Sequence, residues 1–121
     1  MSGYLYIALT IFFTVYGQLI LKWQVSQAGA LPSAASAKIG FLFGLLLNPW
    51  VVSGFFAAFL ASLCWMAAMT RMELSHAYPF VGATFVFVLI GSGLFFGEAI
   101  TPLKIAGTAL IVLGIIVASQ G

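Results

Sequence analysis

The chain has 121 residues, of which 64% are apolar and only 5% are charged, whereas an ordinary soluble domain is about 25% charged. Six charged side chains are too few to cover a water-soluble globule, which excludes a soluble enzyme, and the scattered basic residues form no nucleic-acid footprint. One cysteine and one histidine build neither an internal disulfide nor a metal site. The composition therefore predicts a membrane protein that is not an enzyme and uses no metal or cofactor.

The first predicted membrane span covers residues 4–23. About 20 mainly apolar residues are needed to cross the hydrocarbon core of a bilayer. No basic segment precedes this run, and it is longer than the apolar core of a signal peptide, about 7–15 residues. We therefore interpret it as a retained helix. The following stretch, residues 24–38, contains Gly29, Pro32 and several serines, which indicate a loop outside the membrane.

An apolar run over residues 39–47 is too short to span the membrane. Asn48 and Pro49 interrupt it, because the residue before a proline disfavours helical geometry. This pattern predicts a short interfacial or re-entrant helix, followed by a second span over residues 50–70. A single long kinked helix that begins at Ile39 is the alternative.

Two further spans complete the predicted fold. The third covers residues 77–97, after a polar turn over residues 71–76, and it places Pro79 in its first turn, where a missing N–H costs little. The fourth covers residues 103–119. Short connections between the last three spans predict a single all-α domain, residues 1–121, with four transmembrane helices in an antiparallel bundle.

Polar side chains recur every four residues along the first span. Thr10, Thr14, Gln18 and Lys22 therefore share one helix face. In hydrocarbon an unpaired Gln18 amide would cost several kcal/mol. Either this face forms polar contacts between helices, with the threonines bonded to their own backbone, or it lines a binding site. We favour the first interpretation for the threonines and the second for Gln18 with Lys22.

Lys22 has two possible partners. It can pair with Glu98, which is expected on the same side of the membrane, or it can bind an anionic ligand; these two possibilities remain open. No acidic residue lies within the four predicted spans, whereas export of cations requires a carboxylate at membrane depth. The charge pattern therefore predicts an anionic cargo.

Other residues within the spans suggest packing or binding roles. Gly93 and Gly97 are spaced for close approach between helices. Trp65 and Met66 on the second span either belong to the core or line an apolar groove.

Three motifs carry a resemblance to a known family. Residues 17–22, Gly-Gln-Leu-Ile-Leu-Lys, are similar to a G-Q-x-x-x-K stretch, residues 77–79 to an A-Y-P motif, and Gly97-Glu98 with Thr101-Pro102 to an acidic turn. The chain resembles four-helix members of the drug/metabolite transporter superfamily, which includes small-multidrug-resistance and EamA-like proteins. Thr14 stands where the small-multidrug-resistance exporters have their membrane glutamate. The closest resemblance is to the aminoarabinose-phosphoundecaprenol flippase subunits.

This resemblance implies a flippase in the bacterial inner membrane that moves a polyprenyl-phosphate-linked sugar between leaflets while the tail stays among membrane lipids. It also implies a homo- or heterodimer with a similar subunit. The corresponding hypothesis is that Lys22, aided by Arg71, attracts the phosphate. Glu98 pairs with Lys22 or with a sugar amine. The remaining expected site residues are Gln18, Thr14 and Tyr78 as hydrogen-bonding groups, Thr10 as an extension of that polar track, and Trp65 beside the isoprenoid chain.

Two other functions are compatible with the sequence. One is export of small cationic or polar compounds with an unusual coupling ion. The other is a partner subunit that does not itself transport, in which the polar face of the first span is only an interface between helices.

Overall fold

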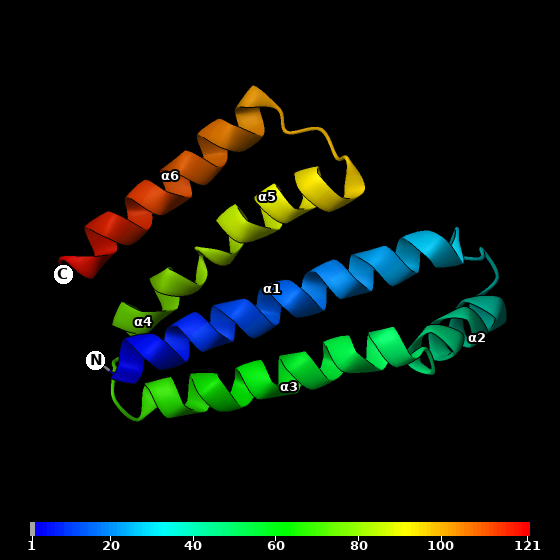
Figure 1. The fold of residues 1–121 in the computed structure, drawn as a ribbon, viewed down its shortest axis with the longest axis horizontal. Helices are drawn as coiled ribbons and strands as arrows, with labels where there is room; N and C mark the ends of the chain where they lie inside the picture. Colours follow the sequence, from blue (N-terminus) through cyan, green and yellow to red (C-terminus); the bar gives the residue numbers. More distant parts are fainter. Residues whose placement is uncertain (1) are drawn as a thin grey trace.

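The fold is known from a computed structural model, which describes residues 2–121. These residues form six helices and no strand. Four segments are long and apolar enough to cross a membrane, and α4 and α5 together make the third of them. Successive spans run in opposite directions (Figure 1), so the predicted all-α, four-span antiparallel fold is confirmed. The helices are α1 (Ser2–Ala28), α2 (Ala35–Leu46), α3 (Pro49–Met69), α4 (Leu74–Val81), α5 (Thr84–Phe96) and α6 (Pro102–Ser119).

Helix α1 continues past Trp23, so the prediction that a loop begins at Gln24 is wrong. The Gln24 side chain is buried, and its Oε1 accepts a hydrogen bond of 3.0 Å from Asn48 Nδ2. Because this buried polar side chain has a hydrogen-bond partner inside the protein, the helix can continue past Gln24. The helix ends at Ala28, before Gly29, whose φ of +94° suits glycine.

Asn48 separates α2 from α3. Its backbone is extended, and its Oδ1 accepts hydrogen bonds from the Trp50 and Val51 amides at 2.8 and 3.4 Å. Pro49 occupies the first helical position, where its missing N–H is harmless. The predicted short helix is therefore a separate element and not part of one long kinked helix. It lies at one end of the α1–α3 pair (Figure 1).

The third span is interrupted in its middle. Helix α4 begins at Leu74, three residues earlier than predicted, so Pro79 lies inside the helix and the prediction that it falls in the first turn is wrong. Pro79 cannot donate to the backbone carbonyl one turn earlier. Just beyond it, tight turns form in which the Gly82 amide donates to the Pro79 carbonyl at 2.9 Å and the Ala83 amide to Phe80 at 3.0 Å. Helix α5 then starts at Thr84.

Helices α1 and α3 form the tightly packed half of the molecule, side by side along their length (Figure 1). Where they cross, a Cβ atom on Gly17 would lie 3.1 Å from the Gly54 carbonyl oxygen. Helix α4 packs against the first part of α1 and the last part of α3 through a small core of Ile7, Ala68 and Ala77. These contacts fix the positions of the three helices that matter most for the site.

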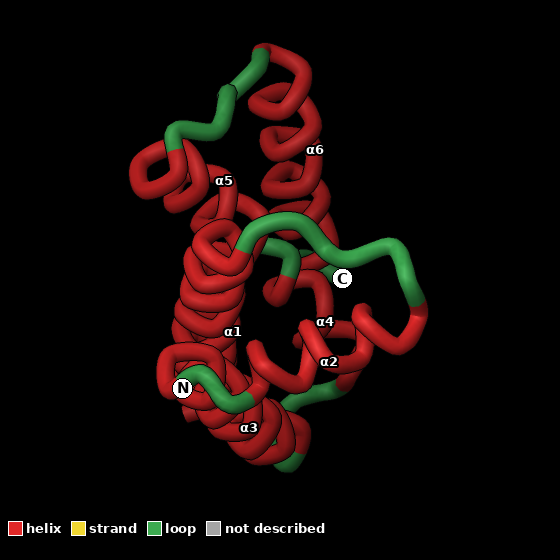
Figure 2. Tube along the Cα trace, turned by 90° about the vertical axis from the view of Figure 1, so that its right-hand side faces the viewer, coloured by secondary structure: helices red, strands yellow, loops and turns green. Residues whose placement is uncertain are grey.

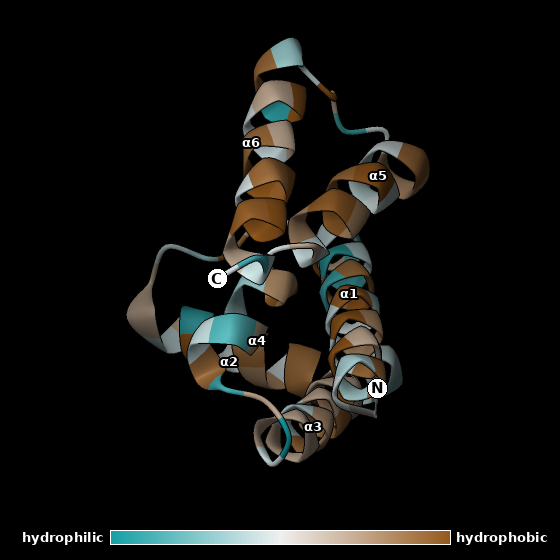
Figure 3. Ribbon diagram, turned by 90° about the vertical axis from the view of Figure 1, so that its left-hand side faces the viewer, coloured by the Kyte–Doolittle hydropathy of each residue, from teal (hydrophilic) through white to brown (hydrophobic). Residues whose placement is uncertain are grey.

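Helix α6 is held more loosely. It packs on α4 and α5, has no buried residue, and stands away from α1 and α3 (Figure 2). Most of its residues are hydrophobic (Figure 3), which suits contact with lipid or another protein. Gly93 and Gly97 do not bring two spans together as predicted. Gly97 ends α5 with a φ of +64°, and Gly93 faces the Ile100 side chain in the following turn.

The close crossing of α1 and α3 predicts that Gly17→Val destabilises the protein. Any Cβ there presses on the Gly54 backbone, so the helices must separate, and we expect the free energy of unfolding to fall by about 1–3 kcal/mol. Tryptophan fluorescence during titration of the detergent-solubilised protein with dodecyl sulfate measures this change. Gly40→Val, where a Cβ would meet nothing within 4 Å, is the matched control. Equal loss of stability in both variants would contradict the prediction.

Candidate functional site

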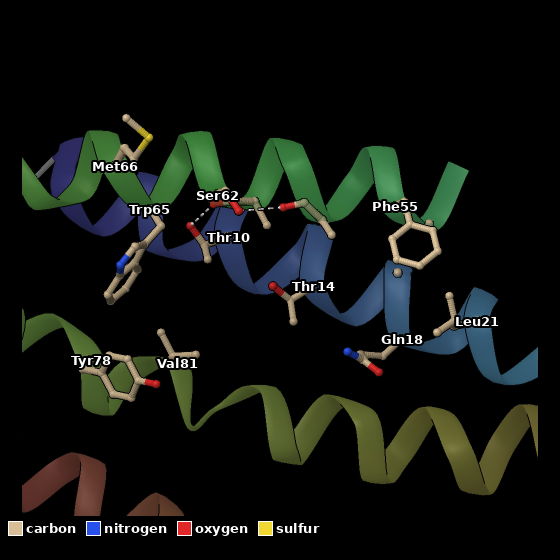
Figure 4. Close-up of a pocket in the computed structure, with 14 residues that line it drawn as sticks. Thr10, Thr14, Gln18, Leu21, Phe55, Ser62, Trp65, Met66, Tyr78 and Val81 are labelled. Atoms are coloured by element: carbon tan, nitrogen blue, oxygen red, sulfur yellow. Dashed lines mark hydrogen bonds between the residues drawn. The ribbon is translucent and has the colours of Figure 1, made fainter. Parts of the chain in front are cut away.

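A groove of about 440 Å³ lies between α1, α3 and α4 (Figure 4). One wall is the polar face of α1, the second is α3, and the third is the start of the interrupted span. We call it the α1–α3–α4 groove. The lining side chains considered below are Thr10, Thr14 and Gln18 from α1, Phe55, Ser62, Trp65 and Met66 from α3, and Tyr78 and Val81 from α4.

Thr10 makes its hydrogen bonds within the protein. Its hydroxyl lies 2.8 Å from the Tyr6 carbonyl of its own helix and 3.4 Å from the Ala61 carbonyl of α3, and it is 7% exposed. A hydroxyl has one proton to donate, and here backbone oxygens receive it. Thr10 therefore bonds back to its own helix, as favoured from the sequence. It lies at the end of the groove nearest the start of α1.

Thr14 and Gln18 lie one and two turns further along the same face, and both point into the groove (Figure 4). The Gln18 amide supplies two N–H donors and a carbonyl acceptor, and the Thr14 hydroxyl adds a further donor and acceptor. Leaving these groups without partners inside a membrane would cost several kcal/mol. The groove is therefore a place for water, a polar ligand or polar groups of a second protein.

Trp65 and Tyr78 form the opposite wall. Their rings meet edge to face, with centroids 5.8 Å apart and planes at 83°, an arrangement that aromatic pairs favour. This contact joins α3 to α4, so Trp65 lines the groove and also holds its wall together. Met66 is 64% exposed and Tyr78 63%, so this wall has both apolar and hydroxyl surface.

Lys22 and Glu98 form an ion pair beyond the end of the groove. The Lys22 Nζ atom lies 3.8 Å from Glu98 Oε2, and the side chains are 55% and 41% exposed. Of the two partners left open for Lys22, the structure contains the carboxylate. An exposed pair of this kind contributes little stability, about 0–1 kcal/mol, so an anionic ligand can replace one partner at low cost.

Charge is absent from the α1–α3–α4 groove itself. Among the described residues that line it, none is acidic or basic. The acidic side chains are Glu73 and Glu98, which lie in the connections that flank the third span. A cation in the groove would therefore meet hydroxyl and amide groups but no carboxylate.

Arg71 lies at the end of the molecule opposite Lys22, so the structure does not bring these two residues of one chain together. The Arg71 Cβ atom is 3.6 Å from where a Cβ on Gly3 would be. From Gly3 to Lys22 the helix rises roughly 28 Å at 1.5 Å per residue. The separation arises because α3 runs antiparallel to α1 and returns the chain to the start of α1.

Several lining residues were not predicted from the sequence, among them Ser62 and Phe55. The Ser62 hydroxyl donates to the Ala58 carbonyl at 3.1 Å and its side chain is exposed to the groove. The available signal was its position three residues before Trp65, which puts both on one helix face. Phe55 has no such signal, because apolar residues surround it in α3.

Similarity to known proteins covers nearly the whole chain. The profile of the EamA-like transporter family matches residues 1–120. The chain is 31% identical over 118 residues to the probable 4-amino-4-deoxy-L-arabinose-phosphoundecaprenol flippase subunit ArnF of Serratia proteamaculans (strain 568), covering 95% of this chain and 90% of the relative. It is 32% identical over 110 residues to the probable subunit ArnE of the same kind of flippase from Aeromonas salmonicida (strain A449), covering 91% and 90%. No solved structure matches the chain significantly.

The match to the family extends over all four apolar spans, and it therefore includes every helix that borders the groove. The chain is a multi-pass membrane protein that belongs to the EamA-like transporter family.

Proposed function

We propose that the chain is a flippase subunit that moves an anionic lipid-linked sugar between leaflets of the bacterial inner membrane. The substrate class is a polyprenyl-phosphate glycoside, such as aminoarabinose-phosphoundecaprenol, the lipid in the names of the relatives. The observation that carries the proposal is the α1–α3–α4 groove, whose described lining offers hydroxyl and amide groups but no charge. Such a lining suits sugar hydroxyls and phosphate oxygens better than a cation.

The headgroup would move along the polar face of α1. Gln18 and Thr14 provide donors for phosphate oxygens, and Ser62 and Tyr78 can exchange hydrogen bonds with sugar hydroxyls. At the mouth of the groove, phosphate displaces Glu98 from the Lys22 ammonium. The released Glu98 carboxylate then binds an amino group on the sugar.

The polyprenyl tail needs no polar path and would stay in the bilayer beside Trp65 and Met66. A second, similar subunit would close the open side of the groove. The relatives are named as subunits, and α6 has surface for such a partner. It has no buried residue, and a Cβ on Gly107 or Gly114 would meet nothing within 4 Å. The assembly is either a homodimer or a heterodimer.

We expect Gln18→Ala to slow translocation. Vesicles reconstituted with the chain and its partner subunit, loaded with a polyprenyl-phosphate amino sugar, report the rate through accessibility of the sugar amine to an impermeant reagent. Losing hydrogen bonds made only during passage should reduce the rate about tenfold, equivalent to about 1.4 kcal/mol. Gln27→Ala, also on α1 but outside the groove, is the matched control. Equal rates for both variants would show that the α1–α3–α4 groove is not the path.

The ion pair at the mouth gives a second prediction, which separates the proposal from cation export. Lys22→Ala should slow translocation at least as strongly as Gln18→Ala, because phosphate loses its cationic partner. Lys38→Ala, a lysine on α2, should have no effect.

Cation export predicts a different pattern. It predicts uptake of a cationic dye that Glu98→Gln abolishes, with no effect of Lys22→Ala. A subunit that does not transport predicts that neither Gln18→Ala nor Lys22→Ala changes the rate set by its partner.

A further inference from the structure

We propose a second headgroup-binding site at the end of the molecule opposite Lys22, built by Arg71, Glu73, Tyr4 and His76. Its ligand class is a phosphate that carries a protonated primary amine nearby, and the inference rests on the proposed function because the ligand is the transported lipid's headgroup. The site lies where the connection between α3 and α4 meets the start of α1. We call it the Arg71 site.

A cavity is already present there. It has a volume of about 540 Å³, and these four side chains line it together with Gly3, Met72 and Gly121. The Tyr4 hydroxyl is 3.0 Å from His76 Nε2, and the Tyr4 and His76 rings both pack edge to face on Phe80. These contacts hold a hydroxyl and an imidazole at fixed positions on the cavity wall.

Arg71 and Glu73 line this cavity without being paired to each other. Among the described residues, the only ion pair with a nitrogen–oxygen distance below 4.0 Å is that of Lys22 with Glu98. Glu73 is the N-cap residue of α4, yet its side chain makes no capping hydrogen bond. The guanidinium can therefore bind phosphate oxygens in its planar fork, while the carboxylate remains available to an ammonium group.

The arrangement repeats the charges found at the other end of α1. Lys22 and Glu98 stand beyond one end of the groove, and Arg71 and Glu73 stand beyond the other. The two ends are roughly 28 Å apart along the helix, close to the hydrocarbon thickness of a bilayer, about 30 Å. A headgroup with one negative and one positive charge thus meets a cation and a carboxylate at both membrane faces.

The groove between these ends supplies only neutral partners. It follows α1 from Thr10 to Leu21, so it begins beside Lys22 and stops less than two turns from Tyr4. Matched charged sites at the two faces give the headgroup similar binding free energy before and after passage. Hydrogen bonds from Gln18 and Thr14 then lower the cost of the uncharged stretch.

Photolabelling tests the proposal directly. The chain and its partner subunit are reconstituted in vesicles of phosphatidylcholine and phosphatidylglycerol, which contain no primary amine. The probe is a polyprenyl-phosphate amino sugar with a diazirine on the sugar, and mass spectrometry locates the label. We expect label at two places, around Lys22 with Glu98 and around residues 71–76.

Arg71→Gln should lower labelling around residues 71–76 about tenfold, as expected for the loss of a charge-assisted contact, and leave labelling near Lys22 unchanged. The label near Lys22 serves as the internal check that the variant is folded. Lys104→Gln, whose ammonium donates to the Ala99 carbonyl at 2.9 Å, should change neither. Glu73→Gln should lower labelling only when the probe carries an amine, and not when a hydroxyl replaces it.

Three outcomes would overturn the proposal in distinguishable ways. Label near Lys22 alone, with normal translocation, removes the Arg71 site and leaves the proposed function intact. Loss of the label at residues 71–76 when phosphatidylethanolamine is added shows a general site for membrane lipid headgroups. If neither labelling nor translocation is detected in any variant, the proposed function itself is wrong.

Discussion

Polar side chains inside a membrane must find partners other than water, and this constraint explains most of the structure. Thr10 donates to backbone oxygens, Tyr16 pairs with Ser53 at 3.0 Å, and Gln24 pairs with Asn48. Gln18 and Thr14 differ, because both point into the α1–α3–α4 groove. Since an unpaired amide in hydrocarbon costs several kcal/mol, the position of Gln18 marks where a polar cargo or partner belongs.

The two halves of the molecule are held with different strength. Helices α1 and α3 are locked by the glycine crossing at Gly17 and Gly54. The third span instead breaks at Gly82, and beside the break the Thr84 hydroxyl oxygen is buried without a hydrogen-bond partner. Segments with few buried contacts rearrange at low cost. Helix α4, before the break, is held on α1 and α3 by its core contacts, so α5 and α6, which have few or no buried residues, are the parts that can rearrange most easily.

Charge is confined to the ends of the spans. Lys22 and Glu98 meet at one end of α1, while Arg71 and Glu73 line a cavity at the other. Burial of a charge in hydrocarbon is costly unless it is paired, so this distribution is the one expected of stable spans. It also leaves the middle of the groove to neutral hydrogen-bonding groups, as the proposed passage of a headgroup requires.

Much of the fold could be predicted from the sequence, because it depends on interactions between residues that are close together along the chain. Runs of apolar residues determine the spans, because each must cover the hydrocarbon thickness, and Asn48 with Pro49 determines the start of α3, because both act within one turn. The four-residue spacing likewise placed Thr14 and Gln18 on one face. The end of α1 was not readable, because the burial of Gln24 depends on Asn48 in another helix. Three further features were decided only by the tertiary structure: the contact of Trp65 with Tyr78, the pairing of Lys22 with Glu98 and the separation of Arg71 from Lys22. Each of them depends on how distant segments of the chain pack together.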